Sequence, residues 1–338
     1  MSESKQVDRR SFLGASVAAV AMGGAAMGGA AKAAEGDKTS PAASGQGAPA
    51  VPHAEPGADG MPYGMLGKVR LSRLFLGGNL VTGCMHSRDL RYVTELFRAY
   101  VTEEKIYQTF KLAEQHGINA VFESGGNYVD RYNKEFGGHM HIIPSIHPDL
   151  GQSDAEIKDE IKQKVDSGAP AFYVWGVRSD ELVRLGNVHV IAKAVEFAKK
   201  YDLPVGVGGH SLQVPKACEK AKVPCDFYVK TFHDDGYPTA TPKELRNDWF
   251  QGRGFFDNMW CTNPQETAEF MATVAKPWIA FKVLAAGAIQ PRQGFAHAFR
   301  NGADFIAVGM FDFQIKEDCE LVKRTVERTK QRARPWYA

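Results

Sequence analysis

Short apolar runs rich in Val, Ile, Phe and Ala recur along the chain from residue 74 onward. Most of them precede a segment with the mixed polar and apolar spacing of an amphipathic helix. This alternation is typical of β-α units arranged around a parallel sheet. We expect a strand in each of eight runs: residues 74–78, 120–124, 141–146, 171–175, 204–209, 226–232, 278–284 and 305–310.

Signals for helix starts stand between several of these runs. Thr102 predicts a helix up to residue 117, Ser153 predicts one toward residue 168, and Pro264 predicts one through residue 275. Eight β-α units over residues 61–338 match the strand number and length of a (β/α)8 barrel. We therefore expect an α/β fold, a single TIM barrel. A doubly wound open sheet is the alternative, and the lack of a G-x-G-x-x-G sequence after the first run disfavours it.

The first 33 residues have a different pattern. Residues 8–13 read Asp-Arg-Arg-Ser-Phe-Leu, and a weakly apolar run of Ala, Gly, Val and Met follows up to residue 31. Ala31 and Ala33 then form an A-x-A cleavage site. This order predicts a twin-arginine signal peptide at residues 1–33. It implies the twin-arginine translocase as a partner during export and a periplasmic or extracellular location.

A membrane anchor is the alternative for this segment. A membrane span needs about 20 strongly apolar residues, whereas this run carries five glycines and little Leu or Ile. Residues 34–60 are mostly Ala, Pro, Gly, Ser and Asp, which predicts a disordered linker. We expect no stable membrane span in the mature chain.

Composition restricts the classes of partner. The net charge is +2 with 24% charged residues, so binding to nucleic acid or to a membrane surface is not indicated, and a small-molecule substrate is expected. The five cysteines lack C-x-x-C spacing and do not describe a disulfide framework. Cys218 and Cys225 could pair in an oxidising compartment, and buried free thiols are expected for most of the five.

Two lysines stand inside apolar runs, Lys230 in the sixth and Lys282 in the seventh. A lysine in such a run is costly to bury unless it is paired or deprotonated. If both side chains point into the barrel, each lowers the pKa of the other, and a neutral amine can attack a carbonyl. The alternatives are a pair with a carboxylate such as Asp226 or Asp312, or an outward orientation between helices.

Histidines and a glutamate follow other runs, at the strand ends where barrels carry their chemistry. His210 ends the fifth run, His233 ends the sixth, His147 follows the third and Glu123 ends the second. Side chains of these types on one barrel face could bind zinc or manganese, or act as acid and base. We expect catalytic roles for His210 and His233. Structural histidines satisfied within the core are the alternative.

Two loops are long enough to serve as binding loops or lids, at residues 80–101 and 234–262. Insertions that only pack over the barrel are the alternative. Residues 86–89 form a polar cluster that could bind substrate or could fix its own loop through an Arg-Asp pair. The residues expected to contact substrate are Asn79, His86, Arg88, Glu123 and Trp260.

Gly287 and Gly309 lie at the ends of the last two runs. Glycines at these positions let backbone amides approach a phosphate, and tight turns use them as well. We expect them to contact a cofactor, for which tightly held NADP and a divalent metal are the candidates. Asp312 nearby disfavours an anion.

The two lysine segments resemble those of class I, Schiff-base aldolases of the deoxyribose-phosphate type. The sixth strand of those enzymes carries D-F-x-K-T and the seventh carries K-x-A-G-G-I. Here residues 226–231 read Asp-Phe-Tyr-Val-Lys-Thr, and residues 282–289 read Lys-Val-Leu-Ala-Ala-Gly-Ala-Ile. The resemblance implies lyase or isomerase chemistry with Lys230 or Lys282 acting on a carbonyl.

A second resemblance is to the aldo/keto reductases. Residues 61–79 are similar to the start of that superfamily, where an LGKTGLKVSRLGLGG-type hairpin leads into the first strand. Residues 117–124, Gly-Ile-Asn-Ala-Val-Phe-Glu-Ser, resemble its GIN-x-FDTA segment. This implies a barrel and reduction of a small carbonyl or sugar-like substrate by a nicotinamide cofactor.

The catalytic tetrad of that superfamily is Asp, Tyr, Lys and His, and the match to it is partial. Glu123 takes the aspartate position, and Tyr128 is the candidate tyrosine. Residues 141–146 hold no lysine, and residues 171–175 hold no histidine, so Lys230, Lys282 or His210 would have to supply the proton. Three functions stay open: an aldo/keto reductase-like oxidoreductase, an aldolase-like lyase or isomerase, and a barrel that binds a carbohydrate or metabolite without catalysis.

Overall fold

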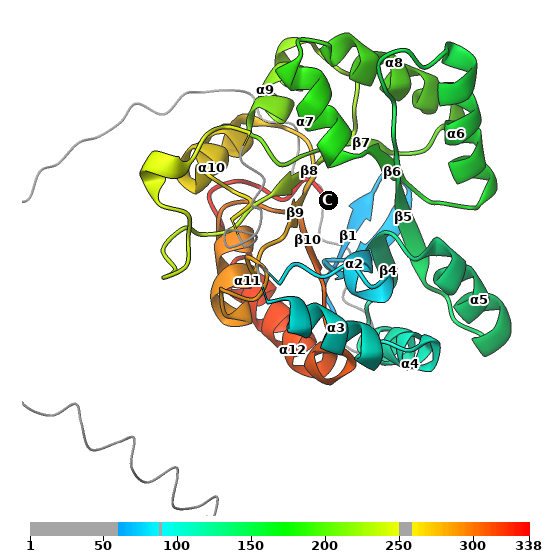
Figure 1. Cartoon of the computed structure of the whole chain (residues 1–338), viewed down its shortest axis with the longest axis vertical. Helices are drawn as coiled ribbons and strands as arrows, with labels where there is room; N and C mark the ends of the chain where they lie inside the picture. The colour runs from blue at the N-terminus through cyan, green and yellow to red at the C-terminus, as the bar shows by residue number, and fades with distance from the viewer. Residues whose placement is uncertain (1–59, 88–89, 250–258) are drawn as a thin grey trace, which may run out of the picture. The chain divides into compact units, whose positions relative to one another are not determined.

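A computed structural model describes residues 60–87, 90–249 and 259–338 (Figure 1). The signal peptide expected at residues 1–33 lies outside the described residues, as does the expected linker apart from Gly60. Arg88, one of the expected substrate contacts, also lies outside them.

Eight parallel strands close into a barrel, in which neighbours follow chain order and β10 returns to pair with β3. The prediction of a single TIM barrel is confirmed, and every strand of the barrel lies within one of the eight expected runs. Because β10 pairs with both β9 and β3, the open doubly wound sheet is excluded. The strands are β3 (Leu74–Gly77), β4 (Ala120–Glu123), β5 (His141–Ile146), β6 (Phe172–Val174), β7 (Val205–Gly209), β8 (Phe227–Thr231), β9 (Trp278–Phe281) and β10 (Phe305–Val308).

Helices pack around the ring of strands, as Figure 1 shows. The Thr102 hydroxyl accepts from the backbone N–H of Lys105, and Ser153 forms a capping box with Glu156. Helix α10 begins at Pro264, so all three expected helix starts are confirmed. The helices are α2 (Gly78–Val81), α3 (Arg91–Tyr100), α4 (Glu103–Gln115), α5 (Gly126–Phe136), α6 (Asp154–Asp166), α7 (Gly176–Arg184), α8 (Val188–Ala198), α9 (Gln213–Lys220), α10 (Pro264–Thr273), α11 (Pro291–Arg300) and α12 (Asp312–Arg328), with 3-10 turns η1 (Lys199–Tyr201) and η2 (Lys243–Leu245).

The barrel interior is filled by aromatic side chains. The ring of Phe122 lies 6.1 Å from that of Phe75 and 5.1 Å from that of Tyr173, both in stacked arrangements. The opposite face of each strand packs under the helices in a second, larger apolar cluster. Both faces of the strands are therefore buried, as is usual in parallel barrels.

The amino-terminal end of the barrel is plugged. An antiparallel hairpin of β1 (Tyr63–Leu66) and β2 (Val69–Ser72) packs on the inward-facing core together with the last residue, Ala338. Arg73 donates to the Ala338 carbonyl oxygen at 2.7 Å and to the Asp304 carbonyl at 2.8 Å. The carboxyl ends of the strands are left to form a site, as in other barrels.

All five cysteines are free thiols, and all except Cys84 are buried, as was expected for most of them. In the described part of the chain, no helix has both the length and the apolar character to cross a membrane.

Asp318 on α12 is a buried carboxylate whose Oδ2 has no hydrogen-bond partner among the described residues. Burial, and then the charge of Glu317, raises its pKa from 3.8 to about 6. A raised pKa contributes stability that is complete below 3.8 and is lost as the pH rises through 6.

We therefore expect Asp318→Asn to increase the free energy of unfolding at pH 7.5 by roughly 1 to 2 kcal/mol, with little effect near pH 4. Urea unfolding at the two pH values measures this difference. Asp159→Asn, which changes an exposed aspartate on α6, is the control and should change neither value. An equal effect of Asp318→Asn at both pH values would contradict the assignment.

Candidate functional site

A cavity opens at the carboxyl ends of the strands and has two lobes, of about 220 and 270 Å³. The first lobe lies against the ends of β3, β9 and β10, and the second against the ends of β6, β7 and β8. Four of the five expected substrate contacts and one of the two lysines therefore lie in one place. The wall shared by both lobes consists of Asn79, Cys84, His86, Glu123, Trp260, Phe281 and Lys282.

Lys282 directly follows β9, and its ammonium lies at the junction of the lobes. Its φ of 56° is in the left-handed region, which costs a non-glycine residue about 1 kcal/mol or more and often accompanies a functional constraint. Nζ lies 2.7 Å from Nε2 of His86 and 4.0 Å from the centre of the Trp260 ring. The ammonium donates to Nε2, so His86 carries its own hydrogen on Nδ1.

His210 follows β7 and forms a buried pair with Asp180 of α7. Nδ1 of His210 lies 2.7 Å from Oδ2 of Asp180, and the side chains are only 9% and 3% exposed. The carboxylate also accepts from the backbone N–H groups of His210 and Ser211 at 3.0 Å. Because Nδ1–H donates to Asp180, the lone pair is on Nε2, which has no hydrogen-bond partner among the described residues. His210 lines the second lobe, and a histidine held in this way can serve as a general base.

Glu123 ends β4 and lies between the two lobes. Its φ of 76° is also in the left-handed region. The indole N–H of Trp175 donates to Oε1 at 2.7 Å. Burial, and then the charge of Glu123 and a hydrogen bond to it, raises the pKa of Tyr173 well above its ordinary value. The phenol therefore keeps its proton, and two donors orient the carboxylate in the cavity wall.

Lys230 lies on the outer face of β8 and does not line the cavity. Its neighbours Val229 and Thr231 line the second lobe, and successive side chains of a strand point to opposite faces. Nζ donates to the carbonyl oxygens of His210 at 2.6 Å and of Thr231 at 2.7 Å, and burial lowers the pKa of Lys230. The condition for mutual pKa lowering, both lysines inside the barrel, is not met.

His233 is fully buried, and both of its ring nitrogens are used by the backbone. Nδ1 donates to the carbonyl of Asp234, and Nε2 accepts from the N–H groups of Trp260 and Cys261, all at 2.9 Å. Burial lowers the pKa of His233 to about 4. Instead of lining the cavity as a catalytic group, His233 fastens the segment that places Trp260 in the cavity wall.

A lowered histidine pKa makes this fastening sensitive to acid. The contribution of neutral His233 to the stability of the fold is complete above its ordinary pKa of 6.5, and it is lost as the pH falls toward 4. Between pH 7 and pH 4, we expect the wild type to lose roughly 2 to 3 kcal/mol more free energy of unfolding than His233→Gln. The exposed His139, changed to Gln, is the control and should follow the wild type in urea unfolding. A His233→Gln curve parallel to the wild type would contradict this role.

His147 lies outside the cavity, with Nδ1 2.8 Å from Glu160 and Nε2 3.2 Å from Ser145. The histidines expected on one barrel face therefore have separate partners. Within residues 60–87, 90–249 and 259–338, no three His, Cys, Asp or Glu side chains are placed to hold one metal ion. The described residues do not fit the zinc or manganese site considered from the sequence.

Gly287 and Gly309 line the first lobe, where a cofactor was expected. From the sequence, the charge of Asp312 was expected to disfavour an anion there. In the structure, the Asp312 carboxylate accepts hydrogen bonds from Lys105 Nζ at 2.9 Å and from the Tyr100 hydroxyl at 2.6 Å. A lobe of about 220 Å³ holds one ring or one phosphate group, because sites for whole drug-sized ligands occupy roughly 300 Å³ or more. The rest of a dinucleotide would have to lie beyond this lobe.

Three residues of the site had no role in the sequence-based prediction: Tyr173, Trp175 and Asp180. Alternation along residues 171–175 puts Tyr173 and Trp175 on one face of their strand, so that signal was present. Asp180 lies 30 positions from His210, and nothing in its own helix distinguishes it from a surface acid.

No family model matches the sequence, and no curated protein matches it. Solved structures share its fold. Two structures of a putative aldo-keto reductase from Pseudomonas aeruginosa align with a TM-score of 0.51 at 15% identity, over 78% of this chain and 95% or 96% of theirs. A mandelate oxidase variant gives only 0.43 at 14% identity, over 83% of this chain and 82% of that one. The chain is thus similar to the aldo-keto reductase structures in its fold, a closed barrel of eight parallel strands.

Proposed function

We propose that the cavity is the active site of an enzyme that moves protons on a small carbonyl or sugar-like substrate, as a lyase or isomerase does. The observation that carries this proposal is the buried Asp180–His210 pair. Nδ1 of His210 is bonded to Asp180, so Nε2 can contact a substrate in the cavity that His210 lines. Lys282 and Glu123 line the same cavity. A base, a cation and an oriented carboxylate around one small space are what proton transfer next to a carbonyl requires.

In this mechanism His210 takes a proton from the substrate carbon next to the carbonyl. The electron pair of that C–H bond moves toward the carbonyl oxygen, where the Lys282 ammonium stabilises the developing negative charge. Asp180 stabilises the imidazolium that forms and keeps its orientation. The proton then returns to the former carbonyl carbon. Glu123, which accepts hydrogen bonds from substrate hydroxyls, carries the proton of the adjacent hydroxyl to the former carbonyl oxygen, and this gives the isomer.

Deuterium exchange tests this function. The full chain is incubated in D₂O with a panel of small hydroxyaldehydes, hydroxyketones and aldoses, and proton NMR follows the hydrogens next to each carbonyl. We expect catalysed exchange or isomerisation of at least one compound, and none with the His210→Gln/Lys282→Met double variant. If the folded wild type binds a compound but exchanges no hydrogen of any compound in the panel, the proposed function is contradicted and a non-catalytic binding barrel is supported.

An oxidoreductase with retained NADP is the second candidate, because the first lobe lies against the loops after β9 and β10, where barrels bind phosphate. Gly287 and Gly309 would hold one ring or phosphate of the cofactor, which supplies hydride when bound. Trp175 stands after β6, where the reductase tetrad would have its histidine, and donates to Glu123, which favours the first candidate. Native mass spectrometry of the purified chain would reveal a retained nucleotide.

We also propose that the chain is exported in its folded state to the periplasm or beyond by the twin-arginine route. Support comes from the arginine pair and the cleavage site within residues 1–33. We expect the Arg9→Lys/Arg10→Lys variant to accumulate uncleaved in the cytoplasmic fraction, whereas a Lys5→Arg control is exported normally. Equal processing of the twin-lysine variant and the wild type in fractionation would contradict export by this route.

A further inference from the structure

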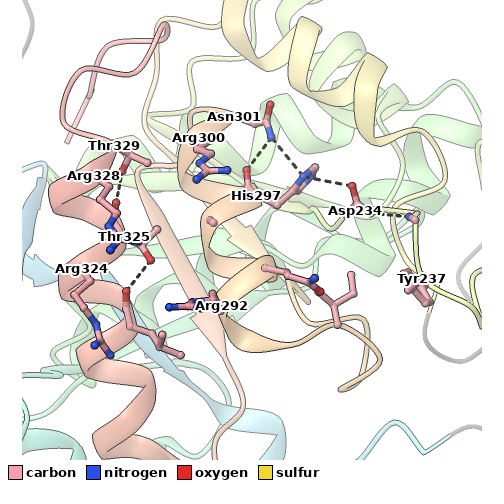
Figure 2. Close-up of a pocket in the computed structure, with 15 residues that line it drawn as sticks. Asp234, Tyr237, Arg292, His297, Arg300, Asn301, Arg324, Thr325, Arg328 and Thr329 are labelled. Carbon is pink, nitrogen blue, oxygen red and sulfur yellow. Dashed lines mark hydrogen bonds and ion pairs between the residues drawn. The ribbon is translucent and has the colours of Figure 1, made fainter. Parts of the chain in front are cut away.

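A groove of about 780 Å³ lies along α11 and α12 and shares no lining residue with the barrel cavity (Figure 2). Four arginines line it, Arg292 and Arg300 from α11 and Arg324 and Arg328 from α12. Figure 2 shows the arginines on the two helices, with Asp234 on the opposite side of the view. The groove therefore concentrates positive charge on a chain whose net charge is only +2.

None of the four arginines forms an ion pair with a carboxylate in the described part of the chain. Nε of Arg324 donates instead to the backbone carbonyl of Glu320, at 3.1 Å. The nearby acids have other partners, since Glu320 pairs with Lys323 and Glu327 pairs with Lys330. Unpaired guanidinium groups in one groove repel one another, so their arrangement has an electrostatic cost.

Helix electrostatics accounts for three of the four positions. Arg300 and Arg328 are the last residues of α11 and α12, and Arg324 lies one turn earlier, where positive charge is favourable. Arg292 is different, because it is the second residue of α11, where the helix dipole disfavours a cation and the first turn holds no acid. An anion in the groove would stabilise all four arginines.

Most hydroxyl and amide groups of the groove are already used, whereas Nε2 of His297 has no hydrogen-bond partner among the described residues. The hydroxyls of Thr325 and Thr329 donate to backbone carbonyls within α12, and the Asn301 amide donates to the carbonyl of His297. Guanidinium N–H groups are thus the main donors left for a ligand, and their fork geometry matches phosphate oxygens. The backbone positions of Arg292 and Arg300 are about 12 Å apart along the helix axis, which favours a ligand with more than one phosphate group.

We propose that this groove binds a molecule with two or more phosphate groups through Arg292, Arg300, Arg324 and Arg328. Phosphates of this kind occur in soluble oligophosphates and in the headgroups of neighbouring anionic phospholipids. The site is separate from the barrel cavity and does not depend on the reaction proposed there.

Calorimetric titration of the full chain with inorganic tripolyphosphate and with orthophosphate tests the site. Tripolyphosphate binds at least 10-fold more tightly than orthophosphate, and its affinity falls as NaCl is raised from 50 to 300 mM, through screening. The Arg292→Gln/Arg324→Gln variant loses at least 10-fold in affinity, and Arg300→Gln/Arg328→Gln loses a similar factor. The control Arg98→Gln/Arg184→Gln removes the same charge from exposed arginines elsewhere and changes affinity less than 2-fold.

A second arm separates the two sources of phosphate. Sedimentation with phosphatidic acid vesicles is compared with sedimentation with phosphatidylcholine vesicles. Tripolyphosphate affinity that the groove variants lose, without vesicle binding, supports a soluble ligand. Vesicle binding that only the groove variants lose supports lipid headgroups. Failure to bind either probe, or an equal loss in the control variant, overturns the proposal.

Discussion

Replacement of His210 by glutamine is expected to lower the rate of proton transfer by about 10² to 10⁴-fold. Glutamine keeps a polar side chain of similar length next to Asp180, but it has no nitrogen lone pair that can take up a proton. The fold should persist, because the strand before His210 and the backbone bonds to Asp180 do not depend on the ring. Proton NMR on a compound selected in the deuterium screen measures the rate.

The chain supplies a closely matched control for this change. His147 also has Nδ1 bonded to a carboxylate, at 2.8 Å from Glu160, but it lies outside the cavity. We expect His147→Gln to change the rate less than 2-fold. An equal loss in both variants, or a His210→Gln protein with full activity, would show that His210 is not the base.

Replacement of Lys282 by methionine is the second large change, with an expected loss of about 10² to 10³-fold. Methionine keeps much of the side-chain volume against Trp260 and removes the charge that lies 4.0 Å from its ring. The same NMR assay measures the loss, and Lys216→Met, which removes a half-buried lysine paired with Glu266, is the control. A fully active Lys282→Met protein would contradict the assigned role.

Two further measurements define how Lys282 acts. We expect Lys282→Arg to retain much more activity than Lys282→Met, because a guanidinium supplies charge but cannot form an imine. Borohydride reduction in the presence of substrate should then leave no adduct on the protein. An adduct mapped to Lys282 by mass spectrometry would instead assign the covalent, aldolase-like route.

The strands of the barrel were predictable because each is a short, mostly apolar run, and most are followed by a helical pattern. Two helix starts were equally legible, since Thr102 and Ser153 cap their helices through local hydrogen bonds. Helix α3, within the first long loop, was not predicted. Val93, Leu96, Phe97 and Tyr100 have helical spacing, so the signal for this helix was present in the sequence. Only Phe97 is buried in the structure.

The orientation of the two lysines was not predictable. Strands of a parallel barrel are buried on both faces, so an apolar run does not reveal which residues point inward. Lys230 points to the outer face of β8, whereas its neighbours Val229 and Thr231 point to the cavity. Lys282 comes directly after β9 and lines the cavity. Similar sequence surroundings thus gave different sides of the sheet.

The hydrogen-bond partners of the histidines could not be predicted from the sequence either. His147, His210 and His233 all follow strands, and nothing in the local sequence separates the proposed base, His210, from the other two. Their roles depend on distant partners, such as Asp180 for His210 and the backbone of residues 260–261 for His233. Such pairings arise only when the barrel closes and brings neighbouring strand ends together.

The most direct test of a proton-moving site at this end of the barrel is a crystal structure of the Lys282→Met protein with a compound that the wild type turns over. We expect the compound in the two-lobed cavity, with its reacting carbon about 3 to 3.5 Å from Nε2 of His210 and its carbonyl oxygen toward position 282. A compound bound with that carbon out of reach of His210 would contradict the proposed site.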